Sequence, residues 1–320
     1  MAFRLERLGK VFDPLVQRPH PWMEEYAQCP VPFVLDEETI RVFITSRGQR
    51  DARGMQVSYP GYVDLDRQNL QRVKAVAAAP ILDLGQVGTF DEFGITPSSI
   101  VRVGGEVYCY YTGWTRMQSI PYTMAIGLAI SRDGGRTFKK LGSGPIVAPA
   151  WNEPYLASGP IVRQIDGQWH MWYLSGRGWQ DDGGKPVPLY QIAHAISSDG
   201  LSWTRDGKAI LPARSDDECQ VSFGLFREAG LWWSIFAWRR GKDFADGGGG
   251  AYRLGLASSS DLLCWERRDA ELDVSAPFGD WDGQMMCYPQ VFELDGSRYL
   301  FYCGNHFGRE GFGLARVICL

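Results

Sequence analysis

One pattern of short segments recurs through the chain and constrains its fold more than any other feature. The full pattern has an apolar segment opened by Pro or Gly, a Gly-containing turn, an aromatic segment, a small-residue segment and a turn around Ser-Asp-Gly. Copies fall at 97–138, 160–203, 223–265 and 289–316, and a degenerate first copy begins at Pro32. Repeats of this length, built from short strands and turns, are typical of radially arranged β-blades. The sequence therefore predicts an all-β protein, a five-bladed β-propeller.

The two ends of the chain are expected to meet in the last blade. The copy at 289–316 stops at its third strand, because the sequence ends at Leu320. Residues 3–12, FRLERLGKVF, resemble the strand that follows the Ser-Asp-Gly turn in other copies. We expect this N-terminal strand to complete the last blade, which removes open sheet edges. No linker or composition shift interrupts the repeat, so residues 1–320 are predicted to form a single domain.

Composition excludes several classes of function. The formal charge is −4 and no basic run is present, which argues against a nucleic-acid partner. We find no charged-then-apolar leader and no apolar run near the roughly 20 residues that span a bilayer, so no membrane association is predicted. The seven cysteines have no paired spacing, which favours a reduced, cytoplasmic protein. No cofactor is predicted.

Three cysteines, Cys29, Cys219 and Cys287, fall near the expected starts of first strands. A thiolate metal site is one interpretation. Small residues crowded near the axis are the other interpretation, and the absence of CxxC or HxxxH spacing favours it. No metal site is therefore predicted.

Candidate site residues follow from strand direction. Strands alternate in direction within a blade, so the start of the first strand and the end of the second lie at one end of the ring. The second strands bring the following residues to this rim: Arg47, Trp114, Arg177, Trp179, Arg239, Asn305 and His306. The segments entering the first strands bring Asp91, Glu218, Asp282 and Tyr288.

These residue types suit a sugar site. Tryptophan faces stack on sugar CH surfaces, carboxylates bind hydroxyls or act as acids and bases, and arginines clamp anionic groups. A structural alternative has equal weight: the arginines and tryptophans pack against the next blade, and the acids are turn residues in the crossovers between blades.

The Ser-Asp-Gly turns are interpreted separately. SRDGGRTF at 131–138 matches the Asp box, S-x-D-x-G-x-T-[FW], and two decayed versions follow at 197–203 and 258–265. In this motif the Asp side chain accepts backbone N–H bonds within a hairpin turn. We therefore expect Asp133, Asp199 and Asp261 to be structural.

Several blade motifs, taken in order, resemble a known superfamily. They are FDEFGITPSSIV with YYTGW, GPIV with WHMWYLSG, DDECQ, AWRR, WDGQMMCYPQV and FYCGNHFGREGFGLA. They are similar to the five-bladed β-propellers that include arabinanases, β-xylosidases, invertases and mannoside phosphorylases. They are most similar to a bacterial group of glycoside-hydrolase-like propellers associated with polysaccharide biosynthesis.

Two positions depart from the hydrolases that the chain resembles. Cys29-Pro30 stands near the place of an inner-strand Asp-Pro, and Ser158-Gly159-Pro160 lacks the acid of another inner strand. Either the acids have moved to Asp91, Glu218 and Asp282, or the protein does not hydrolyse glycosides by the standard route.

The leading hypothesis is a carbohydrate-active enzyme, a glycosidase-like hydrolase whose partner is an anionic sugar or sugar conjugate. Hydrolysis needs one carboxyl group as acid and one carboxylate as base or nucleophile. We assign Glu218 as proton donor and Asp282 as base or nucleophile, with Asp91 orienting or tuning them.

Ligand binding is assigned to the remaining rim residues. Arg47, Arg177 and Arg239 are expected to bind an anionic group, and Trp114 and Trp179 to stack on the sugar ring. The remaining candidates for ligand contact are Tyr288, Asn305 and His306.

Two alternatives stay open. One is a sugar-binding propeller without catalysis, favoured if the acids point into the crossovers. Catalysis is favoured instead if two carboxylates in the pocket lie about 5–10 Å apart. The minor alternative is a sialidase, suggested by the Asp box and the arginines, although the Arg-Ile-Pro motif is absent.

Overall fold

The computed structural model describes residues 1–51, 54–245, 248–274, 279 and 281–320. The regular secondary structure of the described chain is almost entirely β-strand, with short helical turns α1 (Pro14–Gln17), η2 (Asp269–Glu271) and α2 (Asn305–Gly308). Its strands form antiparallel units of the same plan, in which consecutive strands pair with one another.

The first two units share one eight-stranded sheet. The first contains β2 (Glu25–Val34), β3 (Thr39–Arg47), β4 (Ser58–Asp66) and β5 (Asn69–Val76). The second contains β6 (Gly94–Val103), β7 (Glu106–Arg116), β8 (Tyr122–Ser131) and β9 (Lys139–Lys140). A single parallel bridge between Ser58 and Gly94 joins the two units, while all other pairings in the sheet are antiparallel.

The next two units are separate four-stranded sheets. One contains β10 (Ala157–Ile165), β11 (Gln168–Asp182), β12 (Lys185–Ser197) and β13 (Thr204–Ala209). The other contains β14 (Cys219–Glu228), β15 (Leu231–Arg239), β16 (Arg253–Ser259) and β17 (Glu266–Arg267).

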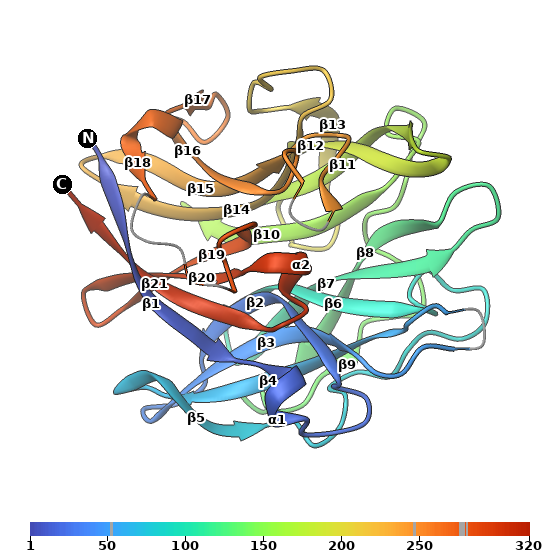
Figure 1. The fold of residues 1–320 in the computed structure, drawn as a ribbon, viewed down its shortest axis with the longest axis horizontal. Coiled ribbons are helices and arrows are strands. Elements are labelled where there is room, and N and C mark those ends of the chain that lie inside the picture. Colours follow the sequence, from blue (N-terminus) through green and yellow to red (C-terminus); the bar gives the residue numbers. More distant parts are fainter. Residues whose placement is uncertain (52–53, 246–247, 275–278, 280) are drawn as a thin grey trace.

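The last sheet joins the two ends of the chain, as predicted. It contains β19 (Cys287–Leu294), β20 (Ser297–Cys303), β21 (Phe312–Cys319), β1 (Phe3–Phe12) and β18 (Leu272–Asp273). The N-terminal β1 pairs antiparallel with β21, so the two termini lie side by side (Figure 1). Phe3 at the start of β1 is fully buried and packs edge-on against Phe226 and Trp233 of the neighbouring sheet.

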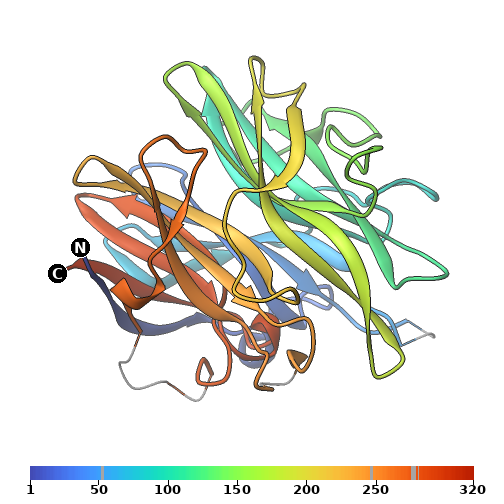
Figure 2. The same ribbon diagram turned by 90° about the horizontal axis from the view of Figure 1, so that it is seen from above.

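The first strands of the units form a closed ring. β2 contacts β6, β6 contacts β10, β10 contacts β14, β14 contacts β19, and β19 contacts β2 again. Figure 1 shows the sheets arranged about this centre, and Figure 2 shows the same arrangement from above. The hydrophobic cores lie between neighbouring sheets, which is why the second strands are aromatic: each presents side chains to both sheet faces.

In the second unit, a glycine in the third strand gives the aromatic second strand room. Tyr111 in β7 lies opposite Gly127 in β8, and a Cβ at Gly127 would lie 2.3 Å from the Tyr111 ring. Glycine therefore lets the fully buried Tyr111 ring lie flat across its neighbour.

The Asp-box prediction is confirmed. Asp133 accepts hydrogen bonds from the backbone nitrogens of Arg136 (3.0 Å) and Thr137 (2.9 Å). Asp199 and Asp261 accept equivalent backbone bonds two and three residues onward. These bonds lower the pKa of Asp199 to about 2, because they favour its charged form.

All seven cysteines lie among the described residues, and each is a free thiol. In the described part of the chain, no helix has the length and apolar character needed to cross a membrane.

Candidate functional site

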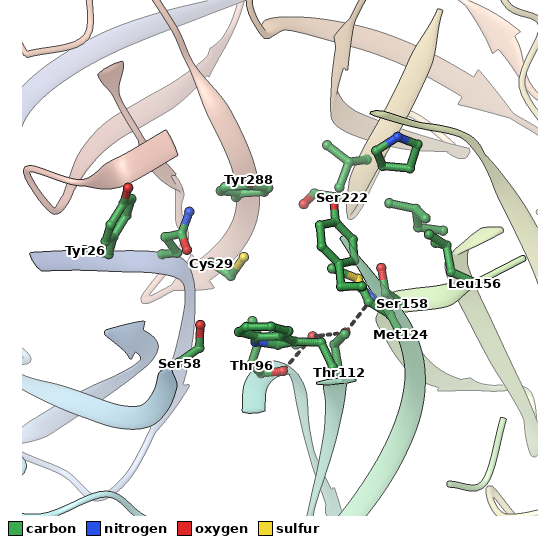
Figure 3. Close-up of a pocket in the computed structure, with 18 of the residues that line it drawn as sticks. Tyr26, Cys29, Ser58, Thr96, Thr112, Met124, Leu156, Ser158, Ser222 and Tyr288 are labelled. Atoms are coloured by element: carbon green, nitrogen blue, oxygen red, sulfur yellow. Dashed lines mark hydrogen bonds between the residues drawn. The ribbon is translucent and has the colours of Figure 1, made fainter. Parts of the chain in front are cut away.

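A cavity of about 490 Å³ lies at the centre of the ring of first strands. Each first strand contributes to its wall, and these contributions are Cys29, Thr96, Ser158, Ser222 and Tyr288. Figure 3 shows these side chains surrounding one shared space. The cavity lies on the axis that these first strands surround.

The backbone around the cavity adopts a conformation that side chains rarely allow. Cys29, Ser222 and Tyr288 have φ of 54°, 55° and 53°, in the left-handed region that favours glycine. Each stands at a register shift between the first and second strands. Such bulges re-aim side chains, and strained residues of this kind cluster at functional sites. The strain supports a functional role for the cavity.

The cavity wall combines aromatic rings with neutral polar groups. The rings belong to Tyr26, Trp114, Tyr122, Tyr190, Tyr252 and Tyr288. The amides and hydroxyls belong to Gln28, Gln56, Gln290, Ser58, Thr96, Ser98, Thr112, Ser158 and Ser222. Among the described residues, no aspartate or glutamate lines this cavity. The wall can therefore stack on and hydrogen-bond a polar ligand, but it presents no carboxyl group to it.

Two arginines line the cavity, and their hydrogen bonds in the described part of the chain go to neutral groups. Arg47 at the end of β3 donates to Gln28 Oε1 (3.0 Å) and Ser58 Oγ (3.3 Å), and its guanidinium lies 4.3 Å from the Tyr26 ring centre. Arg50 donates to the backbone oxygen of Gly54 at 2.9 Å. Neither forms an ion pair with a carboxylate in the described part of the chain. The charge of Arg50 does act on Glu25, whose pKa is lowered against the effect of burial by Arg309 and Gln56 and also by Arg50.

Arg239 lies behind the cavity wall. It is 2 % exposed, at the end of β15, and its Nε donates to the Tyr190 hydroxyl at 2.8 Å. Tyr190 in turn hydrogen-bonds the hydroxyl of Tyr252, and both tyrosines line the cavity. Arg239 is therefore connected to the cavity through two phenols, and it does not line the cavity itself.

The predicted catalytic carboxylates lie in the crossovers, and each is bound to a cation. Asp91 accepts from Lys140 Nζ at 2.6 Å and from the Tyr111 hydroxyl at 3.1 Å. Asp282 accepts from the Tyr302 hydroxyl at 2.8 Å, and Arg7 Nε lies 3.6 Å from the same Asp282 oxygen. Both carboxylates are 1 % exposed.

Glu218 and a fourth acid, Glu153, follow the same arrangement. Glu218 Oε1 accepts from Arg267 Nη1 at 2.5 Å and from Gln220 Nε2 at 2.9 Å. Glu153 is bound by Arg205 and accepts from the Tyr173 hydroxyl at 2.6 Å. We call the four pairs Asp91–Lys140, Glu153–Arg205, Glu218–Arg267 and Asp282–Arg7 the crossover ion pairs.

The crossover ion pairs occupy the same place in their units. Their cations come from the fourth strand of each unit, in β9, β13, β17 and β1. Their acids come from the segment before the first strand or, for Glu218, from the residue before β14. Each pair therefore ties the outer strand of a unit to the crossover that enters it. The catalytic roles assigned to Glu218, Asp282 and Asp91 stay predictions, while these contacts match the structural alternative.

The other predicted ligand-binding residues divide into two groups. Arg47, Trp114 and Tyr288 line the cavity. Arg177, Trp179, Asn305 and His306 do not line it. Arg177 instead donates to the backbone oxygen of Glu218 at 3.0 Å, and both residues line a separate cavity of about 350 Å³.

Trp179 and Asn305 have structural contacts. The Trp179 ring packs edge-on against Tyr122, with ring centres 5.7 Å apart. The Asn305 side chain accepts from the backbone nitrogens of Gln284 (2.8 Å) and Met285 (3.0 Å). His306 lies in α2 with φ of 53°.

Sequence reasoning missed three cavity tyrosines that belong to one position in the repeat. Tyr122 begins β8, Tyr190 lies in the first half of β12, and Tyr252 immediately precedes β16. Because strands alternate in direction, the start of the third strand lies at the same rim as the end of the second. Adding the third-strand starts to the first-strand and second-strand residues would have found them.

Among the described residues, no group of three or more His, Cys, Asp or Glu side chains is placed to hold a metal ion. Cys29 lines the cavity, whereas Cys219 and Cys287 are fully buried. Burial raises the pKa of the Cys29 thiol to about 12, although the nearby Arg47 charge acts in the opposite direction.

Comparison with known proteins gives a relative of nearly full length. Uncharacterized protein Rv1502 of Mycobacterium tuberculosis is 34 % identical over 318 residues, which cover 98 % of this chain and 99 % of that protein. The chain belongs to the family of this mycobacterial protein. No family model matches the chain.

Solved structures identify the fold of the family. A glycoside hydrolase has a TM-score of 0.74 at 16 % identity, over 97 % of this chain and 91 % of the other. A thermostable family-43 glycoside hydrolase has a TM-score of 0.63 at 15 % identity, over 91 % and 88 % of the two chains. A structure from work on the GH130 mannoside phosphorylases has a TM-score of 0.66 at 17 % identity, over 99 % and 94 %. The family therefore has the fold of the β-propeller glycoside hydrolases, as the sequence resemblance implied.

Proposed function

We propose that this protein is a glycosidase-like, carbohydrate-active β-propeller whose axial cavity binds an anionic sugar or sugar conjugate. The proposal takes residues 1–320 as a single domain of five blades, one for each first strand at the cavity. One observation carries it: the cavity has aromatic rings, amides, hydroxyls and two arginines that hydrogen-bond neutral groups, while no carboxylate of the described chain lines it.

The wall chemistry suits such a ligand. Aromatic faces stack on sugar rings, and the neutral polar groups match sugar hydroxyls. Arg47 and Arg50 match a carboxylate, sulfate or phosphate, because a guanidinium binds these groups through two parallel hydrogen bonds. A volume of about 490 Å³ lies within the roughly 300–1,000 Å³ of small-molecule sites.

The location of the acids bears on the reaction. Hydrolysis by a carboxylate pair needs both groups beside the scissile bond. The crossover ion pairs hold four acids away from the cavity lining, each against a cation. This arrangement favours the second candidate function, carbohydrate binding without carboxylate-pair hydrolysis. The glycoside-hydrolase fold supports a carbohydrate as the ligand in both cases.

Calorimetric titration tests the proposal. The ligands are glucuronic acid, galacturonic acid and glucose 6-phosphate, compared with neutral glucose and galactose. We expect the anionic sugars to bind at least about 10-fold more tightly, in line with the strength of a charged hydrogen bond. Arg47→Lys should weaken binding, because it replaces a two-pronged donor by a point charge.

Arg132→Gln is the matched control, because Arg132 is strongly exposed and pairs with Glu106. It should leave all affinities unchanged. Equal affinity for neutral and anionic sugars, or an Arg47→Lys effect no larger than that of Arg132→Gln, would contradict the proposal.

A further inference from the structure

The buried guanidinium of Arg239 is held entirely by neutral groups. Its three nitrogens donate to the Tyr190 hydroxyl (2.8 Å), to the Pro188 backbone oxygen (2.9 Å) and to the Arg240 backbone oxygen (2.7 Å). The Phe244 ring covers it, with 3.8 Å from the guanidinium carbon to the ring centre. In the described part of the chain, no carboxylate forms an ion pair with it. A buried charge without a counter-charge is costly, so this arrangement calls for an anion nearby.

The hydrogen bonds from Arg239 to the cavity have a fixed starting direction. A guanidinium can only donate, so the Tyr190 oxygen must accept from Arg239. Tyr190 and Tyr252 then share one hydrogen bond between their hydroxyls. The two tyrosines have two phenolic protons, and one of them is donated in this bond. Whichever tyrosine donates, one phenolic proton is left over.

The leftover proton belongs to one of two residues that line the cavity. Tyr190 and Tyr252 both line the cavity, and both are at most 7 % exposed. Burial raises the pKa of both phenols, even though the Arg239 charge lowers that of Tyr190. Both hydroxyls therefore keep their protons at neutral pH, and the pair acts as a donor.

We propose that Tyr190 and Tyr252 form a relay that presents this proton to the anionic group of the bound sugar, with the charge of Arg239 behind it. The relay rests on the proposed function, because it assumes that the ligand in the cavity is anionic. Tyr190 and Tyr252 are ligand-binding residues in this scheme, and Arg239 is a positioning residue that polarises them. The ligand supplies the negative charge that the buried arginine lacks.

The relay extends the positive wall of the cavity beyond Arg47 and Arg50. A phenol hydrogen-bonded to a cation is a stronger donor than an isolated phenol, because linked hydrogen bonds polarise one another. A neutral donor of this kind binds an anion at close range without filling the cavity with a long flexible side chain. The charge of Arg239 thereby acts on the cavity in addition to those of Arg47 and Arg50, while the surface at this point consists of tyrosine side chains.

The test uses Tyr190→Phe and Tyr252→Phe, which keep each ring and remove each hydroxyl. Tyr110→Phe is the matched control: it removes the hydroxyl of another buried tyrosine, which donates to the Gly200 backbone oxygen at 3.0 Å and does not line the cavity. The probes are inorganic sulfate and glucuronate. Calorimetry gives their dissociation constants, and circular dichroism and thermal melts follow the fold.

We expect Tyr190→Phe and Tyr252→Phe to weaken both probes by about 10-fold or more. Tyr190→Phe should have the larger effect, because it also breaks the link to Arg239. Tyr110→Phe should lower the melting temperature and leave both affinities within about twofold of wild type. A purely structural role for the relay predicts instead that all three variants lose stability and keep their affinities, and that result would overturn the inference.

The outcomes separate this inference from the proposed function. If sulfate binds in a manner that needs Tyr190 and Tyr252 but no sugar binds, the relay stands and the proposed function fails. If glucuronate binds equally well to wild type and to both variants, the proposed function stands and the relay fails. If wild type binds neither probe, both are overturned.

Discussion

The crossovers and the axial cavity differ in the partners of their charged side chains. In the crossovers, each buried acid has its own lysine or arginine, as in the pair of Glu218 with Arg267. At the cavity, Arg47 and Arg50 have neutral partners, and Arg239 behind the wall has neutral partners as well. The comparison indicates that the acids complete the fold, while the proposed function assigns the arginines at the cavity to ligand binding.

The two regions also differ in what they hold in place. A crossover ion pair joins an outer strand to the segment entering its unit. The cavity residues stand on the first strands at positions of backbone strain, such as Cys29 and Tyr288. Strain of this kind persists only where the surrounding structure enforces it.

Deleting residues 1–13 is expected to have the largest effect on stability of the changes considered. It removes β1, exposes the edge of β21, takes Phe3 out of the core and takes Arg7 away from Asp282. We expect the loss of a cooperative thermal transition, because an open edge and a lost core side chain act together. An unchanged melting temperature in the truncated protein would show that β1 does not close the ring.

Arg267→Met tests a crossover ion pair without removing a strand. It leaves Glu218, which is 2 % exposed, without its cation, and a buried charge that loses its partner costs about 3–5 kcal/mol. Urea denaturation should show this loss in the free energy of unfolding. The double variant Glu218→Gln/Arg267→Met should recover part of it, because Glu218 no longer leaves a buried charge without a partner. Asp269, which also pairs with Arg267, keeps its contact with Arg214. If the double variant is less stable than Arg267→Met, the pair does not act as a charge-matched clamp.

Acid should destabilise the fold through a histidine pair that belongs neither to the crossover ion pairs nor to the cavity lining. His170 Nδ1 and His194 Nε2 lie 3.0 Å apart, and burial with the charge of His170 lowers the pKa of His194 to about 4 from an ordinary 6.5. The pKa of His170 is lowered by burial too, while Asp166 and Asp206 act in the opposite direction on the two rings.

The sign of the effect follows from proton uptake. Between about pH 6.5 and pH 4 the unfolded chain takes up protons that the folded pair does not. Stability should therefore fall as pH falls through this window and stay level above it. His194→Gln should flatten the profile in thermal melts recorded from pH 4 to 8. A His194→Gln profile with the wild-type slope would contradict the assignment.

Much of the fold could be predicted from the sequence because its signals are local and repeated. The turn around SRDGGRTF and the likeness of residues 3–12 to other fourth strands each describe a few neighbouring residues. The structure confirms both, in the Asp133 turn and in the pairing of β1 with β21.

The roles of the acids were harder to predict, because sequence position does not tell which way a side chain turns. Asp91 and Asp282 do precede first strands, but they turn toward a fourth strand and away from the cavity lining. A signal for this was present in the repeat. A basic residue follows the fourth-strand aromatic by two positions at Lys140, Arg205 and Arg267.

The central claim is that cations, and not the crossover acids, hold the ligand. The most direct test compares the dissociation constants of glucuronate for Arg47→Gln and Glu218→Gln by calorimetry. We predict that Arg47→Gln weakens binding by about 10-fold or more, while Glu218→Gln stays within about twofold of wild type. The reverse result, with Glu218→Gln losing affinity and Arg47→Gln keeping it, would contradict the account and place the acids in the site.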